Sequence, residues 1–322
     1  MKKRIYIALA AALFAAALIV ILLLRGGNSQ TVGICYWENE DSSNAAYRSA
    51  LEQALTQQGY KLVVTDADTD QAKQLSIITE LTDKKCDILL IEPVMTDAPE
   101  ELKNAVINAK IPVVLCNREL DMTLWEDLPN VFYVGADSRQ GAALMGEMVL
   151  QLPGSGDING DGVISYLMIC GPENNSRSQL QLQTTGNALA AGEKEAQALA
   201  TVYGDWTDTS GRKLCKQELA KFGKDIEVIL CGNHQMALGA MQAIEDGGRT
   251  VGKDAYLLCM DGDSETLELI TQGSVTGTAV RDTDGEIEGI VKTLELALED
   301  EAVEKQTTVP YLPIFTDKPP LS

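Results

Sequence analysis

Short apolar runs rich in valine and isoleucine alternate with amphipathic segments along most of this chain. The runs read "TVGICYW", "KLVVTDA", "CDILLIEP", "IPVVLCN", "VFYVGAD", "GVISYLMICG", "ALATVYG", "IEVILCGN", "AYLLCMDG" and "VTGTAV". Segments with helical spacing lie between them, such as Ala45–Gln58, Gln71–Leu81, Arg139–Leu152, Gly211–Phe222 and Met236–Asp246. Strands that are apolar on both faces and separated by helices form parallel sheets from βαβ units. The pattern therefore predicts an α/β fold.

The number of such runs predicts two doubly wound sheets rather than one. A chain of 322 residues, 45% of them hydrophobic, also exceeds what one hydrophobic core usually organises. The C-terminal stretch "VPYLPIFTDKPPLS" is rich in proline, and we expect it to be extended.

The N-terminus carries a separate signal. Basic residues precede an unbroken apolar run from Ile5 to Leu24, and Arg25 ends it. A helix over this run spans about 30 Å, enough to cross a bilayer. We expect residues 1–30 to be an uncleaved single-pass membrane anchor and linker, with the rest of the chain outside the cell or in the periplasm. The alternative is a cleaved signal peptide and a secreted protein.

Charge and residue types exclude several classes of function. The net charge of −21 argues against nucleic-acid binding. His234 is the only histidine, and the chain lacks the GxSxG, GxxxxGK[ST] and strand-following GxGxxG motifs, so we expect no enzymatic activity. The seven cysteines lie mostly in apolar runs, where we expect free thiols that act as small hydrophobic residues.

Polar residues follow four of the apolar runs directly: Asn117, Asp137, Asn233 and Asp261. Ligands of doubly wound sheets bind beyond the carboxyl ends of the strands, so these side chains are candidates for a binding site. Each of them also suits the N-cap of the helix that follows, and the sequence alone leaves both roles open.

The stretch "DINGDGVIS" resembles the first nine positions of an EF-hand calcium loop. Asp157, Asn159 and Asp161 occupy positions 1, 3 and 5, and Gly162 is the turn glycine. Position 12, which needs a bidentate glutamate, is Met168. The alternative is a solvated turn built on its Asn-Gly and Asp-Gly pairs.

Several blocks closely resemble the periplasmic galactose/glucose-binding proteins, in the sugar-binding group of type I periplasmic binding proteins. They are "IPVVLCNRE", "FYVGADS", "GDINGDGVIS", "IEVILCGNHQMALGAMQA" and "MDGDSETLELITQGSVTGT", and the match runs from about Thr31 to Phe315. The resemblance implies two doubly wound parallel-sheet lobes joined by a three-strand hinge, crossed near Gly135–Asp137, Val280–Asp282 and Thr307–Val309. The N-terminal lobe is then residues 31–136 plus 282–308, and the C-terminal lobe is residues 137–281 plus 309–322 with the calcium loop.

The same resemblance implies where the calcium loop is completed. In that family the closing glutamate comes from a distant strand, and the matching residue here is Glu227 in "DIEVIL". The implied ligands of a structural Ca²⁺ are Asp157, Asn159, Asp161, the carbonyl of Val163, Ser165 and Glu227. Ser165 departs from the glutamine usual in the family, and its shorter side chain reaches a metal best through water.

A sugar site is implied less evenly. The residues that match the family are Asp41, Asn117, Trp206, Asn233 and Asp261, with Trp206 as one of two rings that sandwich a hexose. The departures are Ser43 at the second ring, Asn175 and Arg177 at a His and an Asp, Gln181 at an Arg and Arg281 at an Asn. Trp37 is a possible replacement for the missing ring. A galactose- or glucose-like hexose is the expected ligand, although Arg177 and Arg281 would also suit an acidic or phosphorylated sugar.

Together these expectations describe a monomeric, extracytoplasmic solute-binding protein. Its two lobes would close on a monosaccharide in the cleft between them and deliver it to an ABC permease. The alternative is a sugar-sensing ectodomain that signals to a chemoreceptor or a two-component sensor. A sugar-responsive repressor would need a basic DNA-binding segment at the N-terminus, where the apolar run stands.

Overall fold

The computed structural model describes residues 30–38, 44–97, 100–299 and 301–316, and it divides the chain into two compact units. Unit 1 comprises the chain up to Val134 together with Ile287–Thr307. Unit 2 comprises Gly135–Glu286 together with the chain from Thr308 onward. Each unit is therefore built from two separate stretches of sequence.

The boundaries between the units fall inside elements of secondary structure. The first and third crossings lie within β5 (Val131–Ala136) and β11 (Gln306–Val309). The second lies between Glu286 and Ile287, in the first turns of α10 (Thr283–Leu298), a few residues after the Val280–Asp282 that the family resemblance implied. Residues 282–286 thus belong to unit 2, because they begin the helix that follows a strand of that unit.

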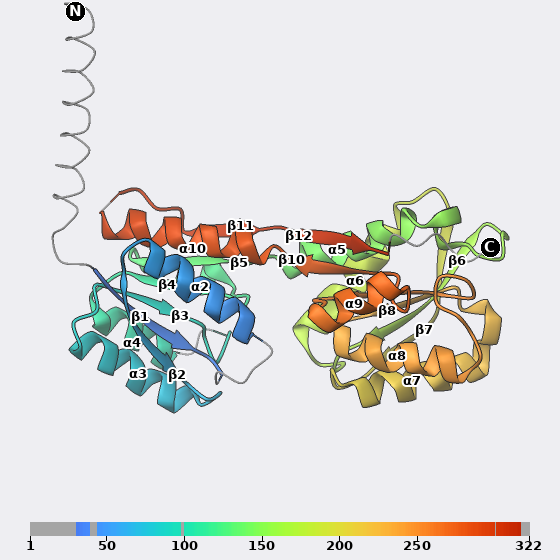
Figure 1. Ribbon diagram of the computed structural model, residues 1–322, viewed down its shortest axis with the longest axis horizontal. Coiled ribbons are helices and arrows are strands. Elements are labelled where there is room, and N and C mark those ends of the chain that lie inside the picture. The colour runs from blue at the N-terminus through green and yellow to red at the C-terminus, as the bar shows by residue number, and fades with distance from the viewer. Residues whose placement is uncertain (1–29, 39–43, 98–99, 300, 317–322) are drawn as a thin grey trace, which may run out of the picture. The chain divides into compact units, whose positions relative to one another are not determined.

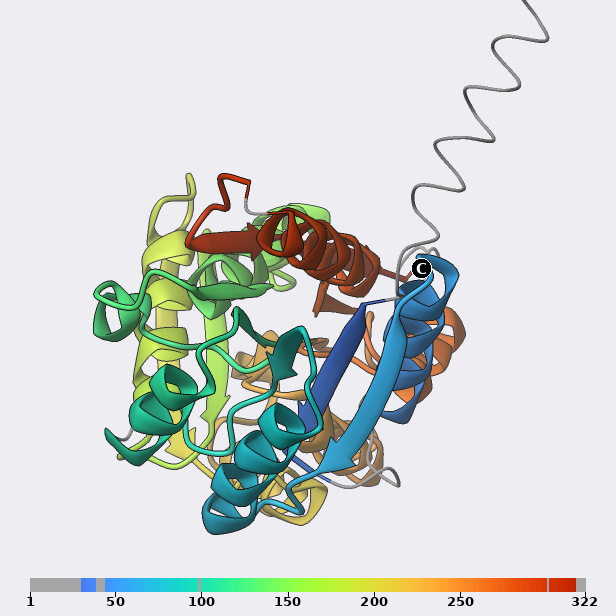
Figure 2. The ribbon, with the colours of Figure 1, turned by 90° about the vertical axis from the view of Figure 1, so that its left-hand side faces the viewer.

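Unit 1 contains a six-stranded sheet in the described residues, with strand order β11-β5-β4-β3-β1-β2. Its further strands are β1 (Thr31–Tyr36), β2 (Lys61–Asp66), β3 (Ile88–Ile91) and β4 (Val113–Cys116). β1 pairs in parallel with β2 and β3, and the parallel pairing continues through β4 to β5. Figure 2 shows β1 and β2, in dark and lighter blue, side by side.

Helices cover both faces of this sheet (Figure 1). Ile78 of α3 (Gln71–Asp83) and Leu102 of α4 (Glu100–Ala109) pack in one hydrophobic cluster. Leu51 of α2 (Ala45–Gln57) and Ile290 of α10 pack in another. The strands "ILLI" and "VVLC" are buried along their whole length because both of their faces meet helices.

Unit 2 repeats this architecture, with strand order β12-β10-β9-β8-β6-β7. Its strands are β6 (Val163–Cys170), β7 (Glu195–Tyr203), β8 (Val228–Cys231), β9 (Tyr256–Met260), β10 (Gly277–Arg281) and β12 (Tyr311–Phe315). All neighbouring pairs are parallel except β10 and β12, which are antiparallel. The stretch expected to be extended therefore forms the edge strand β12.

Unit 2 also has a helix layer on each face of its sheet. Met145 of α5 (Ser138–Leu150) and Leu189 of α6 (Ser176–Ala190) belong to one cluster. Cys215 of α7 (Asp208–Phe222), Ala240 of α8 (His234–Asp246) and Ile270 of α9 (Ser264–Gln272) belong to the other.

Short 3-10 turns lie in both units. Unit 1 has η1 (Met122–Trp125), and unit 2 has η2 (Pro153–Gly156) and η3 (Gly223–Asp225).

The cysteines are part of these cores. All seven are buried free thiols, as the apolar runs around them predicted. Burial raises the pKa of Cys170 to about 12, so this thiol is protonated at neutral pH. The seven cysteines pack as small hydrophobic side chains.

The expected membrane anchor, residues 1–30, lies almost entirely outside the described residues. Among residues that the structure does describe, no helix is both long and apolar enough to span a bilayer.

Candidate functional site

The polar residues of unit 2 gather where its parallel strands end. Arg177 follows β6, Trp206 follows β7, Asn233 follows β8 and Asp261 follows β9. Because the carboxyl ends of parallel strands share one edge of the sheet, these four residues from distant parts of the sequence become neighbours. Direct contacts join them, as described below.

Trp206 is held in a fixed position against the backbone of two strand ends. A Cβ at Gly171 would lie 2.0 Å from Trp206 Cζ2, and one at Gly232 would lie 3.1 Å from Cζ3, so only glycine leaves room for the ring. Asn233 Nδ2 donates to the Trp206 carbonyl at 2.9 Å. The backbone of Trp206 has a φ of 71°, which is rare for so bulky a residue.

Asp261 is connected to this ring through Arg177, and it has two strong partners. The Tyr311 hydroxyl donates to its Oδ1 at 3.0 Å, and the Arg177 guanidinium donates to its Oδ2. The guanidinium carbon of Arg177 lies 5.9 Å from the centre of the Trp206 ring. Asp261 raises the pKa of Arg177, so the two side chains form an ion pair at the edge of an aromatic face.

Two of the residues predicted to bind sugar in unit 2 also stabilise the ends of helices. Asn175 and Asn233 cap α6 and α8, accepting from the backbone N–H groups of Ser178 and Met236. The capping role predicted for Asn233 is confirmed, and its side chain also donates to the Trp206 carbonyl, whereas its role in ligand binding stays a prediction.

Gln181 and Arg281 depart from the family pattern with opposite changes of charge: Gln181 stands where the family has an Arg, and Arg281 stands where it has an Asn. Gln181 is fully buried behind the ring, where its Nε2 donates to the Gly232 carbonyl at 3.2 Å. Arg281 is partly exposed, and its Nη1 lies 3.9 Å from Glu286 Oε2. The first change removes a positive charge, and the charge that the second adds lies near the carboxylate of Glu286.

Unit 1 presents a second polar group at the ends of its own strands. Asn117 follows β4 and donates to Glu92 Oε1 at 2.8 Å, and Glu92 also accepts from the Trp37 backbone N–H at 3.4 Å. Arg118 stacks on the Trp37 ring, 4.3 Å from its centre. Asn117 has a φ of 63°, and Asp41 and Ser43 lie outside the described residues.

Two of these residues escaped the sequence analysis. Glu92 follows β3 directly, so the reasoning that selected Asn117 would have found it; its side chain is buried, with 1% of the residue exposed. Tyr311 lies in β12, whose pairing with β10 brings it beside Asp261, and no local pattern indicated that contact.

The calcium-like loop of unit 2 meets the distant glutamate. Glu227 Oε1 accepts from the backbone N–H groups of Ile158 and Asn159 at 2.7 and 2.8 Å, and its Oε2 accepts from that of Ser165 at 3.1 Å. Asp157 accepts from the N–H groups of Gly160 and Gly162 at 2.7 and 3.0 Å. The carboxylate of Glu227 thus lies against the loop.

A lysine reaches the same loop. Lys194 precedes β7, and Lys194 Nζ lies 2.5 Å from Asp157 Oδ2. This contact lowers the pKa of Asp157. Within the described chain, no three Asp, Glu, His or Cys side chains lie close enough together to hold a metal ion. The loop oxygens are instead held by backbone N–H groups and Lys194.

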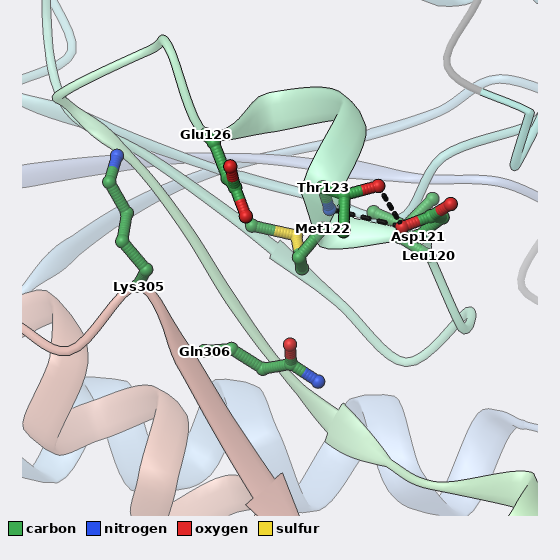
Figure 3. A pocket seen from close by; sticks show the side chains of 7 residues that line it. All are labelled: Leu120, Asp121, Met122, Thr123, Glu126, Lys305 and Gln306. Carbon is green, nitrogen blue, oxygen red and sulfur yellow. Dashed lines mark hydrogen bonds between the residues drawn. The ribbon is translucent and has the colours of Figure 1, made fainter.

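A hollow of about 300 Å³ lies in unit 1, between η1 and the start of β11 (Figure 3). None of the predicted sugar or metal residues lines it. Lys305, one of its lining residues, donates to the Val131 carbonyl at 3.1 Å and to that of Leu128. Lys305 thus links the start of β11 to the start of β5, and its ammonium group is used in that contact. We therefore propose no ligand for this hollow.

The fold and these strand-end groups agree with a sequence comparison that covers most of the chain. Residues 32–302 match the family described as periplasmic binding protein domain. This chain belongs to that family. In open α/β sheets ligands bind beyond the carboxyl ends of the strands, and both polar groups lie at such ends.

Two relatives at low identity match over about four fifths or more of their own length. A Rhizobium meliloti protein described as rhizopine-binding is 24% identical over 314 residues, 96% of this chain and 95% of the relative. A D-galactose/methyl-galactoside binding periplasmic protein of Haemophilus influenzae is 23% identical over 266 residues, 81% and 79% of the two chains.

A solved structure supports the same fold. The periplasmic solute binding protein of an Actinobacillus succinogenes ABC transporter, solved with bound D-allose, has a TM-score of 0.75 at 16% identity. The match covers 90% of this periplasmic binding protein and 98% of the other chain.

Proposed function

We propose that this chain is the sugar-binding component of an ABC transporter and works outside the cytoplasm. The observation that carries the proposal is the Trp206 ring, packed against Gly171 and Gly232, with the Arg177–Asp261 ion pair next to it, since the guanidinium carbon of Arg177 lies 5.9 Å from the ring centre. A ring face suits the C–H patches of a sugar, and a carboxylate beside it accepts from hydroxyl groups. Three of the relatives that match this chain are named for, or were solved with, rhizopine, galactose and allose, which supports a small polyhydroxylated ligand.

We further propose that the ligand is a neutral, galactose- or glucose-like hexose. Arg177 is paired with Asp261, and Arg281 faces Glu286. The positive charges near Trp206 are therefore already balanced, which favours a neutral sugar over an acidic or phosphorylated one. In unit 1 the Glu92–Asn117 pair offers acceptors and donors of the same kind.

The partner and location follow from the same proposal. A membrane permease of the ABC type receives the sugar, and the chain acts as a monomer. Residues 1–30 then anchor the protein to the membrane, or are removed as a signal peptide on secretion. This transport role is favoured over a sensory one, because the relatives named above are binding or transport proteins.

A structural Ca²⁺ in the loop at Asp157–Ser165 is a separate part of the proposal. The donor types fit, because Asp157, Asn159, Asp161 and Glu227 offer the hard oxygen ligands that calcium prefers. Glu227 already lies against the loop. When bound, calcium would link the loop to Glu227, which directly precedes β8, and Asp157 would have to give up its contact with Lys194.

A thermal melt of the full-length chain tests the sugar proposal. The panel is D-galactose, D-glucose, D-allose, D-ribose, myo-inositol and D-galacturonate. A sugar at about 100 times its Kd stabilises the folded state by about 2.7 kcal/mol, which raises the melting temperature by several degrees.

Trp206→Ala is the control, because it removes the ring without touching Asp261. A shift by a neutral hexose that disappears in this variant supports the proposal. A shift by galacturonate alone would replace the hexose with an acidic sugar, and no shift with any sugar would contradict sugar binding.

A further inference from the structure

The loop at Asp157–Ser165 carries more negative charge than the backbone around it neutralises. Asp157, Asp161 and Glu227 bring three carboxylates to it. Asp157 and Glu227 are buried, with 7% and 1% of each residue exposed. Five backbone N–H groups hold these two side chains, but an N–H group carries only a partial charge. A full positive charge nearby stabilises such a buried cluster of anions further.

Lys194 supplies that charge from a different element. β6 and β7 pair in parallel with Val163 opposite Glu195, so the residue before Glu195 comes next to the end of the loop. There Lys194 Nζ lies 2.5 Å from Asp157 Oδ2, and the Asp157 side chain is only 1% exposed. The pairing of β6 with β7 therefore places Lys194 within reach of Asp157, the first residue of the loop.

We propose that Lys194 is the built-in counter-cation of this loop: it holds the loop in place without metal and competes with calcium for Asp157. The calcium part of this inference rests on the proposed function above. Calcium affinity in such loops follows the charge of the ligand set, and Lys194 lowers the formal charge here from −3 to −2. Lys194 thus sets the calcium concentration at which the metal replaces the lysine as the partner of Asp157.

Four forms of the full-length chain test this inference: wild type, Lys194→Met, Lys194→Arg and Lys213→Met. Methionine keeps the length of the side chain and removes the charge, whereas arginine keeps the charge. Lys213 is an exposed lysine on α7 and serves as the matched control. Each form is stripped with EDTA, titrated calorimetrically with CaCl₂ alone, and melted with and without the ion.

We expect K194M to bind Ca²⁺ about tenfold more tightly than wild type, because the competing cation is gone. Without calcium, K194M should melt at a lower temperature than wild type. K194R and K213M should stay close to wild type in both measurements. Calcium binding by K194M alone would be the extreme form of the same result.

Equal affinity and equal metal-free melting in K194M and wild type would overturn the inference. A loss in K194R as large as that in K194M would also overturn it, because charge would then not be the cause. If none of the four forms binds calcium, the calcium proposal fails by itself. The metal-free melts then decide: a loss confined to K194M keeps Lys194 as the counter-cation, and no loss removes it.

Discussion

Three of the residues expected to bind sugar have a left-handed backbone conformation, which Asn and Asp adopt more often than other non-glycine residues and a bulky Trp adopts rarely. Asn117, Trp206 and Asp261 have φ values of 63°, 71° and 55°. In the described part of the chain only eight non-glycine residues have a positive φ. Strained backbone of this kind concentrates at binding sites, where neighbouring groups hold it in place. The conformation therefore supports the same site independently of the residue types.

Gly171 tests how Trp206 is placed. In Gly171→Ala the new Cβ would lie 2.0 Å from the ring, so the indole has to move. We expect sugar affinity to fall at least about tenfold and stability to fall by about 1–3 kcal/mol, the usual cost of overpacking. Tryptophan fluorescence during a sugar titration and urea denaturation measure the two effects.

Gly186→Ala on α6 is the matched control, since the nearest atom to its Cβ is 3.9 Å away. It should bind sugar like the wild type and gain up to about 1 kcal/mol of stability from better helix propensity. Unchanged sugar binding in G171A would show that the position of the ring is not important.

Glu227 should stabilise unit 2 even without calcium. Its carboxylate accepts three backbone hydrogen bonds while buried, and Glu227→Gln replaces one accepting oxygen with a donor. We expect a loss of about 1–3 kcal/mol in EDTA, the cost of leaving a buried N–H unpaired. Urea denaturation beside Glu245→Gln, an exposed glutamate on α8, measures it. A loss no larger than in that control would contradict the structural role.

At the scale of elements, periodicity predicted most of the sheets and helices. Strands such as "ILLI" and "VILC" are apolar on both faces, and both faces are covered. β11, "QTTV", was missed because its alternating exposure gives no apolar run. The second boundary between the units falls inside the continuous helix α10, where no break in the sequence pattern marks it.

The site was less accessible to sequence reasoning than the fold. The end-of-strand pattern indicates Asn117, Asn233 and Asp261, but it cannot distinguish a helix cap from a ligand-binding residue. Asn233 shows why, since it has a capping role and also fixes Trp206. Lys194 reaches Asp157 only through strand register, which one sequence does not reveal.

The turn between β7 and α7 places Trp206, and Asp205 organises that turn. Asp205 Oδ1 accepts from the Thr207 hydroxyl and N–H at 2.6 and 3.2 Å, and these bonds lower its pKa to about 2. A lowered carboxyl pKa stabilises the fold above the usual value of 3.8, and the effect is lost as the pH falls through about 2.

Asp205→Asn should therefore be less stable than wild type at pH 5–7, and the difference should shrink below about pH 4 and vanish near pH 2. Urea denaturation of both forms across this range measures the difference. A difference that stays constant from pH 5 to pH 2 would show that ionisation of Asp205 does not stabilise the turn.

At the scale of the whole molecule, each unit has its own sheet and its own two hydrophobic clusters. Each also presents polar residues at the carboxyl ends of its strands, Glu92 and Asn117 in unit 1, Trp206 and Asp261 in unit 2. The family resemblance predicts that one sugar uses both groups. A ligand that contacts one unit alone would stabilise that unit alone.

Hydrogen exchange with and without a saturating sugar separates these two cases. At about 100 times the Kd, amides that exchange only after the sugar leaves should slow by about 100-fold. We expect that slowing in the segments after β3 and β4 of unit 1 and after β6, β7 and β9 of unit 2. Slowing confined to unit 2 would mean that Trp206 and Asp261 bind the sugar without help from Glu92 and Asn117. The resemblance would then hold for the fold and for half of the site, and the ligand would be one that a single aromatic face and its ion pair can recognise.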